Sequence, residues 1–153
     1  MAAIRPAQRG EAARLSALCI RSKAHWGYDA AFMALSAPSL AVDEGDIVDG
    51  RVLVAVDGAN VPVGVACVIM EAAVADLDLM FVDPPEIGRG AGRALFAAAA
   101  DLARRLGARR MTILADPNAA PFYERMGARY LRQAPSDAIP GRTLPFYEYD
   151  LSP

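Results

Sequence analysis

The chain of 153 residues is poor in the side chains that hold disulfides or metal ions. It has two cysteines, Cys19 and Cys67, each in an apolar segment without a CxxC partner, and His25 is its only histidine. Isolated thiols of this kind fit a reduced, cytoplasmic interior better than a disulfide framework or a zinc site. We therefore expect a cytoplasmic protein that folds without disulfides and uses no metal.

An excess of positive charge is also missing. The chain carries 16 basic and 18 acidic residues, a formal net charge of −2, and Lys23 is its only lysine. Proteins dedicated to nucleic acids or to anionic membranes usually present a basic field. The charge balance therefore argues against a nucleic-acid partner and against a membrane surface.

Long apolar runs are lacking as well. The longest, residues 61–70, is interrupted by Pro62 and Gly64, and it is far shorter than the ~20 residues that span a bilayer. The first residues include Arg5 and Arg9, so we expect no apolar signal peptide there.

What the chain does contain is enough apolar sequence for one core. With 54% hydrophobic and 22% charged residues, residues 1–153 are expected to form a single mixed α/β domain. Short connections between 51 and 82 indicate an antiparallel meander. Periodicity predicts strands at 2–5, 51–56, 63–70, 74–82, 111–114, 129–132 and 145–151, helices at 8–22, 29–35, 93–106 and 118–126, and a connecting region at 36–50.

The most informative segment is a glycine loop, residues 88–92, that leads directly into the longest helix. Glycines let the backbone turn tightly, and the free N–H groups at a helix start carry roughly half a positive charge. The loop therefore predicts an anion site suited to phosphates, with Arg89 and Arg93 beside it. A Walker loop is excluded because no Gly-Lys-Ser/Thr follows, and a dinucleotide GxGxxG starting at Gly88 fails at Arg93.

Residues 79–95 resemble motif A of the GNAT superfamily of acyl-CoA N-acyltransferases, which reads Q/R-x-x-G-x-G/A after a strand. Gly90 and Gly92 fall on its two small positions, whereas Ile87 replaces the leading Gln or Arg. In the family, the phosphate contacts at that leading position are largely main-chain amides. The replacement by Ile87 thus leaves those main-chain contacts possible, although it removes one polar side chain.

Residues 118–128 resemble the end of motif B of the same superfamily, N-x-x-A-x-x-F-Y-x-x-x-G-F. The internal spacing is shortened by one or two residues, and Ala128 replaces the usual Phe. Two blocks in the correct order, separated by one helix and one strand, are far more specific than either alone. Residues 22–28 also resemble a bacterial subgroup of the superfamily with poorly defined substrates.

The resemblance implies a mixed, mostly antiparallel seven-stranded sheet with helices on both faces and a splay between the fourth and fifth strands, here 74–82 and 110–114. In the family, acetyl-CoA lies in that opening, with its pantetheine arm beside the fourth strand and its pyrophosphate on the glycine loop. The matching cofactor positions in this chain are Met80, Phe81, Val82, Ile87, Gly88, Arg89, Gly90, Ala91, Gly92, Arg93, Asn118 and Phe122.

The family chemistry is direct transfer of an acyl group, usually acetyl, to an amine. Tyr123 matches the family's general acid, which protonates the departing thiolate; an ordinary surface helix residue is the alternative. For the base, a period of two along 74–82 places Asp76 and Asp78 on one face together with Met80. We expect Asp78 to be the base because it is closer to the predicted reaction centre, unless both carboxylates only coat a solvated face.

Two further segments are expected to form the acceptor pocket. His25, Trp26 and Tyr28 lie between the first two helices, where the family covers its acceptor, and an aromatic wall attracts a cationic amine. Arg142 precedes the last strand and could hold a substrate carboxylate. An aromatic cluster that pins the helix junction and an ordinary surface arginine are the competing interpretations.

The resemblance thus predicts an N-acetyltransferase that uses acetyl-CoA to modify a primary amine of a small molecule or peptide, and analogy with the family suggests a homodimer. A non-catalytic acyl-CoA-binding or interaction module on the same fold is the main alternative. A nucleotide-binding protein that uses the glycine loop for another phosphate ligand is a third. The motifs leave open which amine is the acceptor and how long the acyl group is.

Overall fold

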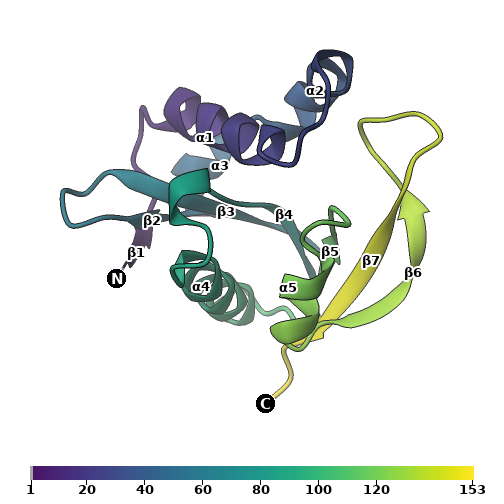
Figure 1. Ribbon diagram of the computed structural model, residues 1–153. Helices are drawn as coiled ribbons and strands as arrows, with labels where there is room; N and C mark the ends of the chain where they lie inside the picture. The colour runs from purple at the N-terminus through teal and green to yellow at the C-terminus, as the bar shows by residue number, and fades with distance from the viewer. Residues whose placement is uncertain (1) are drawn as a thin grey trace.

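The backbone of residues 2–153, described in a computed structural model, is organised around one seven-stranded sheet (Figure 1). The strand order is β1-β2-β3-β4-β5-β7-β6, and every neighbouring pair is antiparallel except β4 and β5. This arrangement confirms the predicted mixed, mostly antiparallel α/β fold. The strands are β1 (Ala3–Pro6), β2 (Val52–Val56), β3 (Pro62–Glu71), β4 (Val74–Val82), β5 (Arg110–Leu114), β6 (Arg129–Pro135) and β7 (Thr143–Asp150).

Helices cover both faces of this sheet, with α1 and α3 over one face and α4 over the other (Figure 1). α2 follows α1 and leads into the 3₁₀ turn η1, whereas η2 and α5 follow β4 and β5. No helix in residues 2–153 is long and apolar enough to cross a membrane. The helical segments are α1 (Ala12–Ala24), α2 (Ala30–Ser36), η1 (Ala37–Leu40), α3 (Glu44–Val48), η2 (Pro84–Glu86), α4 (Ala91–Arg105) and α5 (Ala120–Arg125).

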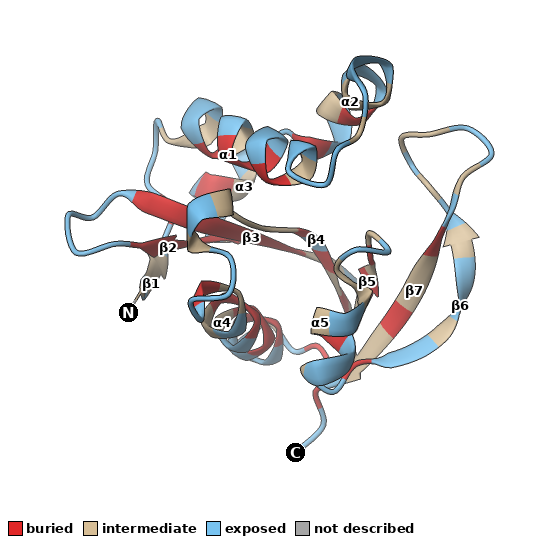
Figure 2. Cartoon of the chain, in the orientation of Figure 1, coloured by how far each residue is buried: buried red, intermediate tan, exposed pale blue. Residues whose placement is uncertain are grey.

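Each face of the sheet has its own apolar core, and Figure 2 shows buried positions concentrated on the central strands and on the inner sides of α1 and α4. Leu15 and Leu18 of α1 are buried against one face, and Leu95 and Phe96 of α4 against the other. Burying a side chain of this size contributes about 1.5–3 kcal/mol. The two cores therefore hold a helix firmly on each side of β4.

The sheet opens between β4 and β5. Their parallel ladder joins only Val74–Asp76 to Arg110–Thr112, although β4 continues to Val82 and β5 to Leu114. Within residues 2–153, the later part of β4 therefore has no strand partner on its β5 side. This opening is the predicted splay between the fourth and fifth strands, and its free backbone groups need another hydrogen-bond partner.

β4 also contains a β-bulge that the sequence pattern does not reveal. Cys67 of β3 pairs with Leu79, whereas the next residue, Val68, pairs with Leu77. Asp78 is therefore an extra residue, opposite no partner of its own. An extra residue of this kind bends a strand and re-aims the side chains that follow it.

The bulge exchanges the faces on which β4 side chains lie. Ahead of it, Ala75 and Leu77 belong to the core beneath α4. Beyond it, Met80 and Val82 pack against that same core, while Leu79 lies in the core beneath α1. The prediction that alternate residues of the whole strand share one face is therefore wrong, because the period of two does not survive the extra residue.

Residues 36–50, expected as a connection, contain η1 and α3. Ile47 of α3 is buried in the core beneath α1, and Glu44 and Asp46 stand in the first turn of the helix, where carboxylates are favoured. A helix of this length offers too few positions for a periodic signal. Elsewhere the predicted elements exist and only their ends move, as where β6 continues to Pro135.

Candidate active site

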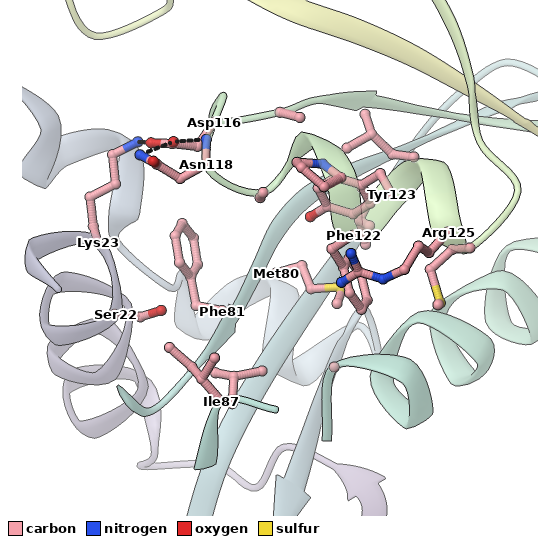
Figure 3. A pocket seen from close by; sticks show the side chains of 18 of the residues that line it. Ser22, Lys23, Met80, Phe81, Ile87, Asp116, Asn118, Phe122, Tyr123 and Arg125 are labelled. Carbon is pink, nitrogen blue, oxygen red and sulfur yellow. Dashed lines mark hydrogen bonds and ion pairs between the residues drawn. The ribbon is translucent and has the colours of Figure 1, made fainter. Parts of the chain in front are cut away.

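A cleft of about 600 Å³ occupies the opening between β4 and β5 and extends past the start of α4 to α5 and the end of α1 (Figure 3). Of the predicted cofactor residues, Arg89 and Ala91 are outside its lining, Arg89 being exposed and Ala91 buried at the base of α4. The other predicted cofactor residues line the cleft: Met80, Phe81, Val82, Ile87, Gly88, Gly90, Gly92, Arg93, Asn118 and Phe122.

The glycine loop forms a tight turn at the N-terminus of α4. Gly88 and Gly90 have φ angles of 84° and 93°, a left-handed conformation that glycine adopts without steric cost. The amides of Ile87 and Arg89 were expected to contact the cofactor. They instead donate to carbonyls within this turn. The first N–H groups of α4 have no partner within a helix, and with the partial positive charge of the helix start they are able to bind an anion.

Gly92, in the first turn of α4, brings bare backbone up to the cleft. A Cβ at this position would lie 3.3 Å from Cε1 of Phe122 and 3.7 Å from Cε of Met80. Any larger side chain would therefore occupy the cleft between these two residues. Narrow space over exposed amides, with Arg93 beside it, fits a diphosphate carried on a thin chain.

Tyr123 lies on the wall of the cleft beside Phe122, with the two ring centroids 5.2 Å apart (Figure 3). The side chain is buried, and among residues 2–153 no side chain or backbone group is hydrogen-bonded to its hydroxyl. Burial, together with the nearby Asp116 carboxylate, raises the pKa of Tyr123 far above its ordinary value. The hydroxyl therefore keeps its proton throughout the physiological pH range and is available as a hydrogen-bond donor.

A second cleft, of about 300 Å³, adjoins the first and shares six residues with it: Lys23, Leu77, Asp78, Phe81, Leu114 and Leu144. Its other walls come from η1, from β4 and from the loop between β6 and β7, which contributes Asp137 and Arg142. Asp78 thus lies where the two clefts meet.

Asp76 lines only the second cleft. Burial raises the pKa of its carboxyl to about 6, against the effect of a 3.0 Å hydrogen bond donated by Thr112 Oγ1. Burial also raises the pKa of Asp78, and the negative charge of Asp137 adds to both shifts. Both carboxylates are therefore better proton acceptors than a solvated aspartate.

A polar network that the sequence analysis missed joins the end of α1 to the segment after β5. Lys23 Nζ lies 2.7 Å from Asp116 Oδ2, and the Tyr28 hydroxyl donates to the same oxygen at 2.8 Å. Asn118 Nδ2 donates to Asp116 Oδ1 at 3.0 Å and to Tyr28 at 3.2 Å (Figure 3 draws the lysine, aspartate and asparagine). Arg142 Nη2 donates to Tyr28 at 3.0 Å.

This network uses side chains that were expected to contact ligands. Asn118 and Tyr28 bond within the protein, and the guanidinium of Arg142 lies 4.9 Å from the ring centroid of Phe32. The pKa of Asp116 is below its ordinary value, because hydrogen bonds from Lys23 and its neighbours outweigh the opposing effect of burial. Two features of the sequence could have pointed to this network: Lys23 is the only lysine, and Asp116 lies just before motif B.

The predicted aromatic wall does not form as a unit. Trp26 is exposed at the first cleft, and His25 is exposed outside both clefts, with its ring centroid 5.1 Å from that of Trp26. Tyr28 stacks on Phe32 at 4.0 Å, so its ring is part of the helix junction. Of these three predicted side chains, only Trp26 lines a cleft.

Comparison with known proteins identifies the fold and the cleft together. A family model described as "Acetyltransferase (GNAT) family" matches residues 21–128. The chain belongs to the GNAT acetyltransferase family. The matched range contains the glycine loop, α4, β5 and α5, which are the GNAT segments around the first cleft. No curated protein matches the chain.

Solved structures share this GNAT fold over the whole chain. A GCN5-related N-acetyltransferase from Rhodopseudomonas palustris is 27% identical, with a TM-score of 0.77 over 98% of this chain and 96% of that one. The protein yncA from Salmonella typhimurium, solved with its cofactor acetyl-CoA, is 21% identical, with a TM-score of 0.72 over 100% and 95%. PaiA N-acetyltransferase from Thermoplasma acidophilum, in complex with coenzyme A, is 13% identical, with a TM-score of 0.79 over 98% and 99%.

Proposed function

We propose that this chain transfers an acetyl group from acetyl-CoA to a primary amine of a small molecule or peptide. The observation that carries the proposal is the opening between β4 and β5, because a single cleft there joins the glycine loop to Asp78 and Tyr123. Two proteins with this fold were solved with acetyl-CoA or coenzyme A, which supports the choice of acyl donor.

The diphosphate of coenzyme A is assigned to the N-terminus of α4. The free amides of the first turn supply donors, Arg93 adds positive charge, and Gly92 leaves the approach open. The amide groups of the pantetheine arm are assigned to the main chain of Met80–Val82, on the side of β4 that β5 leaves unpaired.

Bound acetyl-CoA would supply an acyl group activated as a thioester, so that transfer forms an amide N–C bond, breaks a C–S bond and leaves one proton for the sulfur. The acceptor must be neutral, yet an amine with a pKa of about 10.4 is only ~0.1% neutral near pH 7.4, a deficit of about 4 kcal/mol. Asp78 is assigned as the proton acceptor, directly or through water, with Asp76 as the second candidate. Tyr123 is assigned as the proton donor to sulfur, because it lines the cleft and its hydroxyl is protonated at neutral pH.

The proposal is tested by calorimetric titration with acetyl-CoA, followed by a thiol-release assay over a panel of primary amines. We expect binding and measurable turnover with at least one amine. Absence of binding at millimolar acetyl-CoA would overturn the proposal. Binding without turnover would favour a non-catalytic acyl-CoA-binding module, and displacement of coenzyme A by ATP or NAD would favour a nucleotide site. Light scattering on the same sample tests the homodimer that the family suggests.

A further inference from the structure

The second cleft is lined by three carboxylates. Asp76, Asp78 and Asp137 line it, and none of them takes part in an ion pair found among residues 2–153. They come from β4 and from the loop between β6 and β7, so the fold brings them to one cavity. Two further acidic residues add to the local potential, since Asp46 raises the pKa of Asp78 and Glu71 that of Asp76.

The two cations at this cleft are already engaged. Lys23 lies 2.7 Å from Asp116, and Arg142 lies 3.9 Å from the same carboxylate while it donates to Tyr28. Asp116 is thus shared by both cations, so that these three side chains together carry one positive charge. The three carboxylates of Asp76, Asp78 and Asp137 exceed it, and the net charge around the second cleft is negative.

A buried hydroxyl is an independent sign of a ligand. Ser36, the last residue of α2, lines the cleft and is only 4% exposed. Its hydroxyl enters none of the hydrogen bonds found within residues 2–153, and it is not sealed inside the protein. With no partner in the part of the chain that the structure describes and an opening onto the cleft, this hydroxyl is available to a polar group of a bound molecule.

We propose that the second cleft binds an acceptor amine that carries a second positive charge, such as an aliphatic diamine or a diamino sugar. This inference rests on the proposed acetyl transfer, because Asp78 joins the two clefts. The volume of about 300 Å³ is at the lower end of small-molecule pockets. No three His, Cys, Asp or Glu side chains of residues 2–153 are grouped to hold a metal ion, so the carboxylates suit an extended organic cation.

The two amines of such an acceptor have different tasks. One must be present as R–NH₂, so that its nitrogen forms the amide bond and gives up one proton. The other stays as –NH₃⁺ and is held by charge-assisted hydrogen bonds to carboxylates, which are stronger than neutral ones. Asp137 and Ser36 lie outside the first cleft, and they are therefore the groups assigned to the second amine.

The test compares 1,4-diaminobutane, n-butylamine and 2-deoxystreptamine in the thiol-release assay at pH 8 and low salt. We expect kcat/KM for at least one diamine to exceed that for n-butylamine by about tenfold, the size expected of charge-assisted hydrogen bonds. A preference for 1,4-diaminobutane would indicate an aliphatic diamine as the acceptor, and a preference for 2-deoxystreptamine would indicate a cyclic, sugar-like diamine. Asp137→Asn and Ser36→Ala should each lower the diamine-to-butylamine ratio about threefold. Asp101→Asn, the same charge change on the exposed side of α4, should leave the ratio unchanged.

The outcomes separate this inference from the proposed function. Equal kcat/KM for n-butylamine and both diamines overturns the inference and leaves acetyl transfer standing. Absence of turnover with every amine overturns the proposed function instead. In that case calorimetry with 1,4-diaminobutane decides: binding that Asp137→Asn weakens supports the dication site, and absence of binding overturns it.

Discussion

The two clefts of this protein differ in what builds them. The first has the glycine backbone at the start of α4 as one of its walls, and most of its predicted residues line it. The second is made of side chains from η1, β4 and the loop between β6 and β7. A site built from backbone needs glycines at fixed positions and so leaves a pattern in the sequence. A site built from side chains far apart in the chain leaves none.

The largest effect is expected from filling the backbone-built cleft. Gly92→Leu should reduce acetyl-CoA affinity more than about 100-fold, or about 2.7 kcal/mol, because its side chain would meet Phe122 and Met80. Calorimetric titration measures the loss. Ala97→Leu, at an exposed position of the same helix, is the control and should bind normally. Unchanged affinity in Gly92→Leu would show that acetyl-CoA does not pass this point.

Removing the Tyr123 hydroxyl should affect turnover but not binding. Tyr123→Phe is expected to lower kcat about 100-fold while the KM for acetyl-CoA changes less than about twofold, because a proton donor acts only during transfer. Steady-state kinetics with the best amine measure both constants. Tyr130→Phe, an exposed tyrosine of β6 outside both clefts, should behave as the parent. Normal kcat in Tyr123→Phe would remove this residue from the mechanism.

The network between the clefts should be worth about 2 kcal/mol of stability. Lys23→Met leaves the Asp116 carboxylate, which is 11% exposed, without its closest cation. The double variant Lys23→Met/Asp116→Asn should recover part of that loss in a denaturation cycle. The pKa of Asp116 is depressed below its ordinary value of 3.8, so this stability is present above that pH and is lost as pH falls below it. Additive losses at pH 7 would mean that the pair is not coupled.

The acidic cleft should cost the folded state stability at neutral pH. The pKa of Asp76 is raised by burial to about 6, so its ionisation opposes folding above that pH, and protonation relieves the cost as pH falls through 6. Asp76→Asn should raise the free energy of unfolding by roughly 1 kcal/mol at pH 8, less than the full shift implies because the carboxylate is partly solvated. The gain should shrink by pH 5. An equal gain at both pH values would attribute it to something other than charge.

The smallest effect is expected from restoring the motif A side chain. Ile87 is 40% exposed at the first cleft, and Ile87→Gln supplies one more hydrogen-bond donor there. Acetyl-CoA affinity should rise about two- to threefold, the size of one solvent-exposed hydrogen bond. Val61→Gln, an equally exposed apolar position in the turn after β2, should change nothing. A loss of affinity in Ile87→Gln would show that the cofactor needs an apolar contact at this position.

Periodicity predicted the order of elements and the glycines predicted the anion loop, because these depend on local sequence, whereas the splay was implied by the resemblance to the GNAT superfamily. Sequence patterns failed where one residue changes the geometry or where distant parts meet. The bulge at Asp78 breaks the period of two without any change in composition. Asn118 matches motif B, yet its side chain bonds to Tyr28 and Asp116, which the spacing of a motif does not reveal. Asp137 and Ser36 come together only through tertiary structure.

The bulge in β4 also limits how this strand can change in length. Because one additional residue decides on which face of the sheet each side chain lies, deleting a single residue of β4 ahead of Met80 would move Met80 and the residues after it to the opposite face. Insertions and deletions are therefore expected to be tolerated in the flanking turns and rejected within β4, and a protein engineer who wishes to graft a new specificity here should substitute residues and keep the count.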